Sequence, residues 1–124
     1  MTNHSDIYRQ ITKIEPHQLT KKAVSSTDFS APEKFDLDVM RTFEELETLL
    51  LRKHKDYGPK NIAMAPGGPI NGLRVRMWDK MARINNLVDS KQESLNEPLE
   101  DSFADLANYA IIGLMVLRGQ WPSE

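Results

Sequence analysis

The stretch EDSFADLANYAIIGLMVL, residues 100–117, decides the fold. At about 100° per residue, Asp101, Asp105, Asn108 and Ile112 fall within one narrow sector of an α-helix. The second half of the stretch is apolar almost all the way round, so the lower part of this sector is expected to be packed. The pattern therefore predicts that two acids and an amide lie at the edge of a protein interior.

Helical patterns continue on the N-terminal side of this stretch. Its own helix is predicted to run over about residues 96–118, with Gly119 after its end. A second helix over about residues 73–89 carries apolar residues on two opposite faces, and a first helix over about 36–54 carries one apolar stripe. No strand-like alternation appears, so the sequence predicts an all-α protein.

Two segments are predicted to be irregular. Residues 1–35 are mainly polar and contain Pro16 and Pro32, which interrupt any helical period and indicate an N-terminal arm. The segment AMAPGGPING, residues 63–72, is rich in glycine and proline and indicates a loop. The domain organisation predicted is an irregular arm followed by a helical domain over residues 36–120.

The length of the chain limits how much core it can build. Its 124 residues, 40% of them hydrophobic, suffice for one domain. Three helices give a thin core, and a helix that is apolar on opposite faces needs a partner from outside its own chain. The fold expected is a small helical bundle completed by homo-oligomerisation.

Composition excludes several classes of protein. The net charge is -2, so no basic excess favours nucleic acid as a partner. There is no cysteine, which excludes disulfides, Cys-zinc sites and thiol nucleophiles. The first residues do not have the pattern of a signal peptide, and the longest apolar run, residues 109–117, is too short to span a bilayer. We expect a cytoplasmic protein without a membrane partner.

The acids of the opening stretch are candidate metal ligands. A partly buried carboxylate must be hydrogen-bonded, paired with a cation or bound to a metal. Mg²⁺ is held by one or two carboxylates together with water and substrate phosphates. The helix dipole alone explains Asp101, which lies near the helix N-terminus, but not Asp105, which lies further in. A metal site and a structural salt-bridge network both remain open.

The first predicted helix also carries polar residues within an apolar stripe. Glu47 and His54 are seven residues apart and fall inside its apolar stripe. Glu47 is therefore a candidate for completing a metal site. His54 fits either a packed core histidine or a ligand-binding residue.

Charged, aromatic and amide side chains gather at the end of this helix, in KHKDYGPKN, residues 53–61. Tyr57 could stack on a base, Asp56 and Asn61 could hydrogen-bond it, and Lys60 could bind a phosphate. The alternative is a helix stop surrounded by solvated charges.

The second helix carries a line of cations. Arg76, Lys80 and Arg83 are spaced four and three residues apart, so they could clamp a polyphosphate. Alternatively, Asp79 pairs with one of the arginines on an ordinary salt-bridged face. Both interpretations remain open.

These motifs together resemble a known family. The segments KHKDYGPKNI, GLRVRMWDKMARINNLVD and ESLNEPLEDSFADLANYAIIGL occur in the order found in the nucleotide modification associated domain 1 family, which is common in phages and bacteria. The resemblance covers about residues 43–117 and implies a role in nucleotide or DNA-modification metabolism, in the host cytoplasm if the chain is phage-encoded. The chain is more distantly similar to the MazG-like all-α nucleoside triphosphate pyrophosphohydrolases, which hold Mg²⁺ with acidic helices.

The resemblance implies Mg²⁺-dependent hydrolysis of (deoxy)nucleoside triphosphates to monophosphate and pyrophosphate. Asp101 and Asp105, with Glu47 or Asp79, would hold the metal. The expected nucleotide-binding residues are His54, Asp56, Tyr57, Lys60, Asn61, Arg76, Lys80, Arg83 and Asn108. The alternative is a protein that binds a nucleotide or cyclic nucleotide without cleaving it, because the second helix is rich in cations and the acidic motifs depart from the pyrophosphohydrolase pattern.

Overall fold

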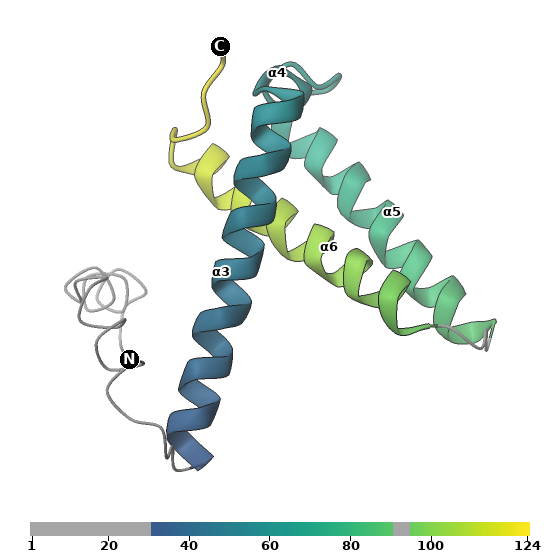
Figure 1. The fold of residues 1–124 in the computed structure, drawn as a ribbon. Helices are drawn as coiled ribbons and strands as arrows, with labels where there is room; N and C mark the ends of the chain where they lie inside the picture. Colours follow the sequence, from purple (N-terminus) through teal and green to yellow (C-terminus); the bar gives the residue numbers. More distant parts are fainter. Residues whose placement is uncertain (1–30, 91–94) are drawn as a thin grey trace, which may run out of the picture. The chain divides into compact units, whose positions relative to one another are not determined.

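The computed structural model describes residues 31–90 and 95–124, in which four helices and no strand are present (Figure 1). The all-α prediction is confirmed for this part of the chain. The helices are α3 (Ala31–Tyr57), α4 (Lys60–Ala63), α5 (Pro69–Asp89) and α6 (Asn96–Leu117). None of these helices is long and apolar enough to cross a membrane. The chain divides into two units, residues 1–42 and 43–124.

The first unit is described from residue 31, where α3 begins. The prediction of an irregular arm up to residue 35 is wrong for residues 31–35, which are helical, and residues 1–30 lie outside the described residues. The helix begins early because Pro32 occupies its first turn, where a missing N–H costs no hydrogen bond. Within this unit, Lys34 Nζ lies 2.7 Å from Asp38 Oδ2.

In the second unit, α3 ends where the sequence changes to glycine and proline. Gly58 has a φ of 71°, a left-handed conformation that suits glycine, and its N–H donates to the His54 carbonyl at 2.8 Å. The short helix α4 follows directly, and its Ala63 N–H donates to the Pro59 carbonyl at 3.0 Å. Helix α4 was not predicted, because four residues are too few to show a helical period.

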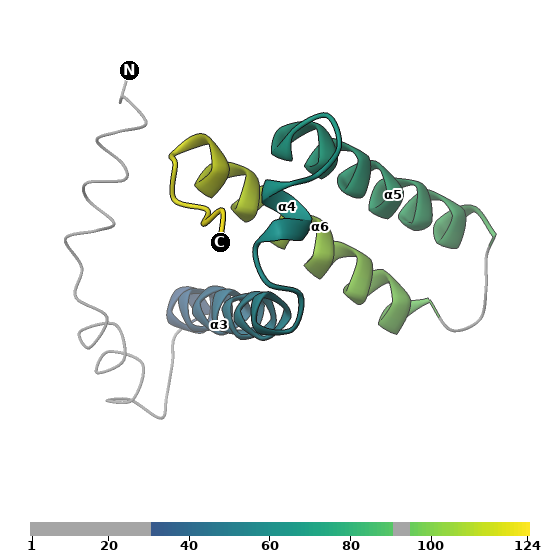
Figure 2. The ribbon, with the colours of Figure 1, turned by 90° about the horizontal axis from the view of Figure 1, so that it is seen from above.

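Helices α5 and α6 lie side by side and run in opposite directions (Figures 1 and 2). The bounds of α6 agree with the prediction for residues 96–118. Helix α5 begins at Pro69, four residues before the predicted start, and proline again occupies the first turn. The predicted loop over residues 63–72 is therefore shorter than expected.

The core of the second unit forms where α4, α5 and α6 meet. Ile62, Leu73 and Ile112 are buried together. Partly buried side chains pack against this cluster, namely Leu50, Tyr109, Val116 and Trp121. Buried Asn108 donates through Nδ2 to the Leu46 carbonyl at 3.1 Å and so connects α6 to α3. The prediction that the apolar lower part of the α6 sector is packed is confirmed at Ile112, which is buried.

The two predicted apolar faces of α5 have different environments. One face is buried only in part: Leu73 and Ile84 are buried, whereas Met81 and Val88 are exposed. On the other face, Val75 and Trp78 are exposed, Trp78 by 66%. Within the described residues, a single chain thus covers part of one apolar face of α5 and leaves the second face open.

Candidate functional site

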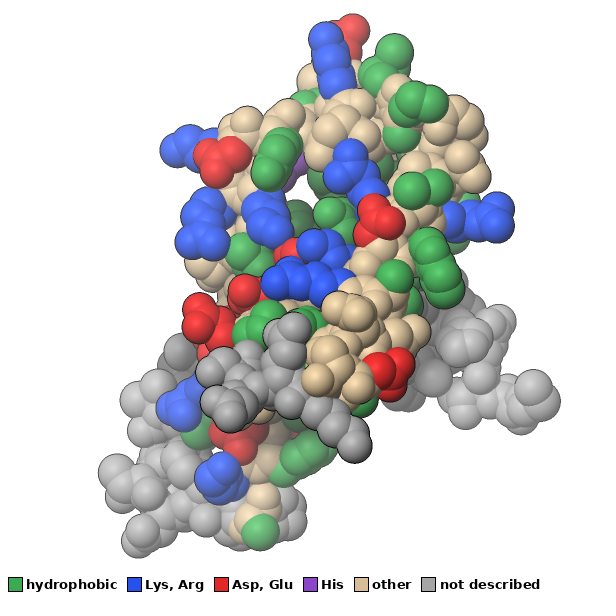
Figure 3. All heavy atoms as spheres, turned by 90° about the vertical axis from the view of Figure 1, so that its right-hand side faces the viewer, with side chains coloured by type: hydrophobic (Ala, Val, Ile, Leu, Met, Phe, Trp, Pro, Cys, Tyr) green, Lys and Arg blue, Asp and Glu red, His purple; other side chains and the backbone are tan. Residues whose placement is uncertain are grey.

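A cavity of about 290 Å³ lies within residues 43–124, bounded by α3, α5 and α6. Figure 3 shows Lys and Arg side chains around a hollow whose floor is apolar. The described residues that line the cavity are Leu50, Lys53, His54, Tyr57, Gly58, Asn61, Ile62, Arg76, Lys80, Asp105, Asn108, Tyr109, Ile112 and Trp121.

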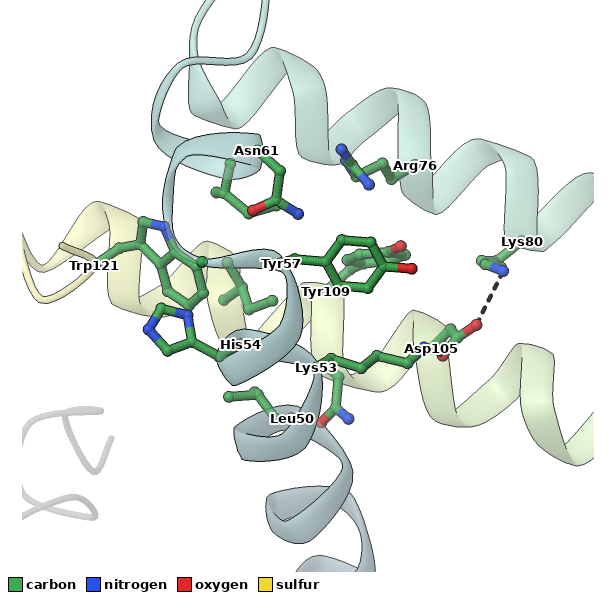
Figure 4. Close-up of a pocket in the computed structure, with 14 residues that line it drawn as sticks. Leu50, Lys53, His54, Tyr57, Asn61, Arg76, Lys80, Asp105, Tyr109 and Trp121 are labelled. Carbon is green, nitrogen blue, oxygen red and sulfur yellow. Dashed lines mark hydrogen bonds and ion pairs between the residues drawn. The ribbon is translucent and has the colours of Figure 1, made fainter. Parts of the chain in front are cut away.

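One end of the cavity is charged, and its groups come from three helices (Figure 4). Lys53 Nζ of α3 lies 2.7 Å from Asp105 Oδ1, and Lys80 Nζ of α5 lies 2.9 Å from Asp105 Oδ2. The carboxylate, which α6 supplies, therefore links all three helices. Arg76, one turn before Lys80, places its guanidinium carbon 6.0 Å from the centre of the Tyr109 ring, within the range of a cation–π contact.

Asp105 is ionised at neutral pH. Burial raises the pKa of its carboxyl, but hydrogen bonds from Lys53 and Lys80 and the charges of both lysines lower it more, so the pKa lies below its usual value. A carboxylate with a lowered pKa stabilises the fold above its unfolded pKa, and this stability is lost as the pH falls through the folded pKa. The link from Lys53 through Asp105 to Lys80 is therefore intact at neutral pH and weakens only in acid.

The opposite end of the cavity is aromatic. His54 and Trp121 meet edge to face, with ring centroids 5.0 Å apart, and Asn61 lies above them on α4 (Figure 4). The Trp121 indole N–H donates to the Pro59 carbonyl at 3.1 Å, which holds the segment after α6 against the turn between α3 and α4. This end offers flat rings and an amide in place of charges.

Three buried polar atoms at the cavity have no hydrogen-bond partner among the described residues: His54 Nδ1, Asn61 Oδ1 and Asn108 Oδ1. Asn108 is only 6% exposed, and its Nδ2 is already bonded to the Leu46 carbonyl. A buried polar atom without a partner costs roughly 1–3 kcal/mol. Such atoms at a cavity wall are suited to bonding a ligand that offers donors and acceptors.

The structure brings seven of the predicted site residues to one cavity. They are His54, Tyr57, Asn61, Arg76, Lys80, Asp105 and Asn108. For Asp105, a metal site and a salt-bridge network were both open, and the structure shows salt bridges to two lysines. The other predicted nucleotide-binding residues, Asp56, Lys60 and Arg83, are exposed and do not line the cavity.

The four acids predicted to hold Mg²⁺ are not brought together. Asp105 lines the cavity with both oxygens bound to lysine, whereas Glu47, Asp79 and Asp101 are exposed and lie outside it. Within residues 31–90 and 95–124, no three His, Cys, Asp or Glu side chains are grouped so that they could hold a metal ion. The described residues of the cavity do not fit a magnesium site made from this set.

The sequence interpretation missed three lining residues that matter. Lys53 stands in the charge cluster at the end of the first helix, where the sequence does not distinguish it from the neighbouring cations. The sequence pattern indicates only apolar packing for Tyr109 and no role for Trp121, since an isolated aromatic residue carries no periodic signal. Only Lys53 had a detectable signal, because it lies one turn before Tyr57 on the same helix face.

The fold and the cavity together define a class: an all-α protein with a cavity that is cationic at one end and aromatic at the other. Residues 53–117, more than half of the chain, match the family model described as nucleotide modification associated domain 1. The chain belongs to this family, as its motifs suggested. No curated protein and no solved structure matches the chain.

Proposed function

We propose that the protein binds a nucleotide in this cavity without cleaving it, with the phosphate at the charged end and the base at the aromatic end. The observation that carries the proposal is the convergence of Lys53, Arg76 and Lys80 from two helices on one cavity. Family membership supports a nucleotide-related role.

The charged end is suited to a phosphate. An ammonium group has three donors, and Lys53 and Lys80 each use one of them on Asp105. Their remaining donors, with the fork of donors on the Arg76 guanidinium, can hydrogen-bond phosphate oxygens. Charge-assisted bonds of this kind are about twice as strong as neutral ones.

The aromatic end is suited to a base. Exposed Tyr57 and half-buried Trp121 offer ring faces or edges against which a base can pack. The unpartnered Asn61 Oδ1 and His54 Nδ1 supply polar atoms for its edge. A base bound here would remove part of the cost of leaving these atoms without partners.

Binding is favoured over Mg²⁺-dependent hydrolysis because the one carboxylate among the described lining residues is engaged by two lysines. Hydrolysis by this protein stays a prediction, and one experiment distinguishes it from binding without cleavage. The protein is incubated with ribo-, deoxy- and cyclic nucleotides plus Mg²⁺, then denatured, and the supernatant is run on an anion-exchange column. We expect every nucleotide to return intact, with some depleted from solution before denaturation. Monophosphate and pyrophosphate formed by the protein would establish a hydrolase instead.

The proposal includes assembly of two or more copies. A groove between α5 and α6 is lined by the described residues Asn71, Arg74, Val75, Met77, Trp78, Met81, Phe103, Leu106, Ala107 and Ala110. It carries one charged side chain, Arg74, among these ten. Two copies of this two-helix face can pair around a twofold axis as a four-helix arrangement, which would cover Trp78 and Phe103 and enlarge a core that is small in one chain.

A charge placed in this groove should dissociate the oligomer. Trp78→Glu would put an unpaired carboxylate into an apolar interface while disturbing little in a single chain, where Trp78 is exposed. We expect the dissociation constant to rise at least tenfold in sedimentation velocity. Leu51→Glu is the matched control, because Leu51 is also exposed but lies on α3 outside the groove. A wild-type chain that sediments as a monomer at micromolar concentration would contradict the assembly.

A further inference from the structure

The charges at the cavity suit an anion with about two negative charges. Lys53, Arg76 and Lys80 are opposed by Asp105, so these groups leave two net positive charges. A phosphate monoester carries about -1.5 to -2 at pH 7. One such group balances the net positive charge at the cavity, and the described lining residues supply no further Lys or Arg for a second phosphate.

Asp105 also limits how far a chain of phosphates can extend. It lies with Lys80 at the end of the cavity opposite Trp121 (Figure 4). A ligand whose base lies near Trp121 would therefore point its phosphate toward Asp105. Like charges in close proximity repel, so a second or third phosphate continuing in this direction would meet the Asp105 carboxylate.

Polyphosphates would also lack support for their metal ion. They bind proteins as Mg²⁺ complexes in which one or two carboxylates take part. Both oxygens of Asp105 are bonded to lysine, and no other acid is among the described lining residues. A cavity of about 290 Å³ lies at the lower end of the usual range for ligand pockets, so it matches one small nucleotide.

From these observations we infer that the cavity selects a nucleoside monophosphate over the corresponding di- and triphosphates, and that Asp105 is the residue that sets this selectivity. The inference rests on the proposed function and deepens it. Asp105 acts as an internal anion that leaves Lys53 and Lys80 enough donors for one phosphate and repels the next.

The test is calorimetry with the mono-, di- and triphosphates of adenosine, guanosine, cytidine and uridine, each measured in EDTA and again with Mg²⁺. For the nucleoside that binds best, we expect the monophosphate to bind wild type at least tenfold tighter than the triphosphate. Asp105→Asn keeps the shape of the side chain, removes its charge and frees lysine donors. The substitution should reduce the ratio of the triphosphate dissociation constant to the monophosphate dissociation constant at least fivefold, mainly because the triphosphate binds better.

The matched control is Asp101→Asn, the same change one turn earlier on α6, where the side chain is exposed and outside the cavity. It should leave the ratio as in wild type. A wild-type protein that binds the triphosphate as tightly as the monophosphate would overturn the inference and leave nucleotide binding intact. An unchanged ratio in Asp105→Asn would overturn the role of Asp105. If no nucleotide binds at all, the proposed function itself fails, and the inference fails with it.

Discussion

Replacing Lys80 with alanine should weaken nucleotide binding by about 1.5–3 kcal/mol, the usual contribution of a hydrogen bond to a charged group. This corresponds to a roughly 10- to 150-fold higher dissociation constant. The loss is expected because Lys80 lines the cavity, where its ammonium group lies 2.9 Å from Asp105. Calorimetry with the best-binding nucleotide of the panel measures the effect.

Arg83→Ala is the control for this prediction. Arg83 lies three residues further along α5, belongs to the same cationic line in sequence, and is exposed outside the cavity. We expect the nucleotide affinity of the Arg83→Ala variant to stay within about twofold of wild type, as for a screened surface charge. Equal losses in both variants would indicate a general electrostatic attraction and contradict a phosphate site at Lys80.

Replacing Leu73 with alanine should lower the free energy of unfolding by about 2–5 kcal/mol, as for other large-to-small changes in a packed core. Leu73 is 2% exposed and is buried with Ile62 and Ile112. Its truncation would leave a void where α4, α5 and α6 meet. Urea unfolding at one fixed protein concentration measures the change, because assembly makes apparent stability depend on concentration.

Leu51→Ala provides the same chemical change at an exposed position of α3, where the side chain is 57% accessible. Its effect should stay within about 0.5 kcal/mol, as is usual for surface substitutions. If Leu51→Ala were as destabilising as Leu73→Ala, the described core would not be the main source of stability in the second unit.

The three long helices were largely predictable; the errors are the starts of α3 and α5, the end of α3, predicted near residue 54 and observed at Tyr57, and the short helix α4. Apolar periodicity in α6 depends on residues three and four apart, so it can be recognised without knowing the partner helices. The starts of α3 and α5 were placed too late, because Pro32 and Pro69 were interpreted as breakers although each occupies a first turn. Proline has both roles, and the sequence alone does not distinguish them.

The sequence by itself determined the all-α class and the family, and it singled out seven of the fourteen described residues that line the cavity, because these follow from local spacing and from motifs. Only the tertiary structure decided which of them meet. Lys53 and Asp105 are 52 residues apart, so their ion pair depends on how α3 packs against α6. Lys80 and Arg83 share one cationic line, yet a three-residue step turns a side chain by about 60° around the helix. That rotation is enough to place Lys80 in the cavity and Arg83 in solvent.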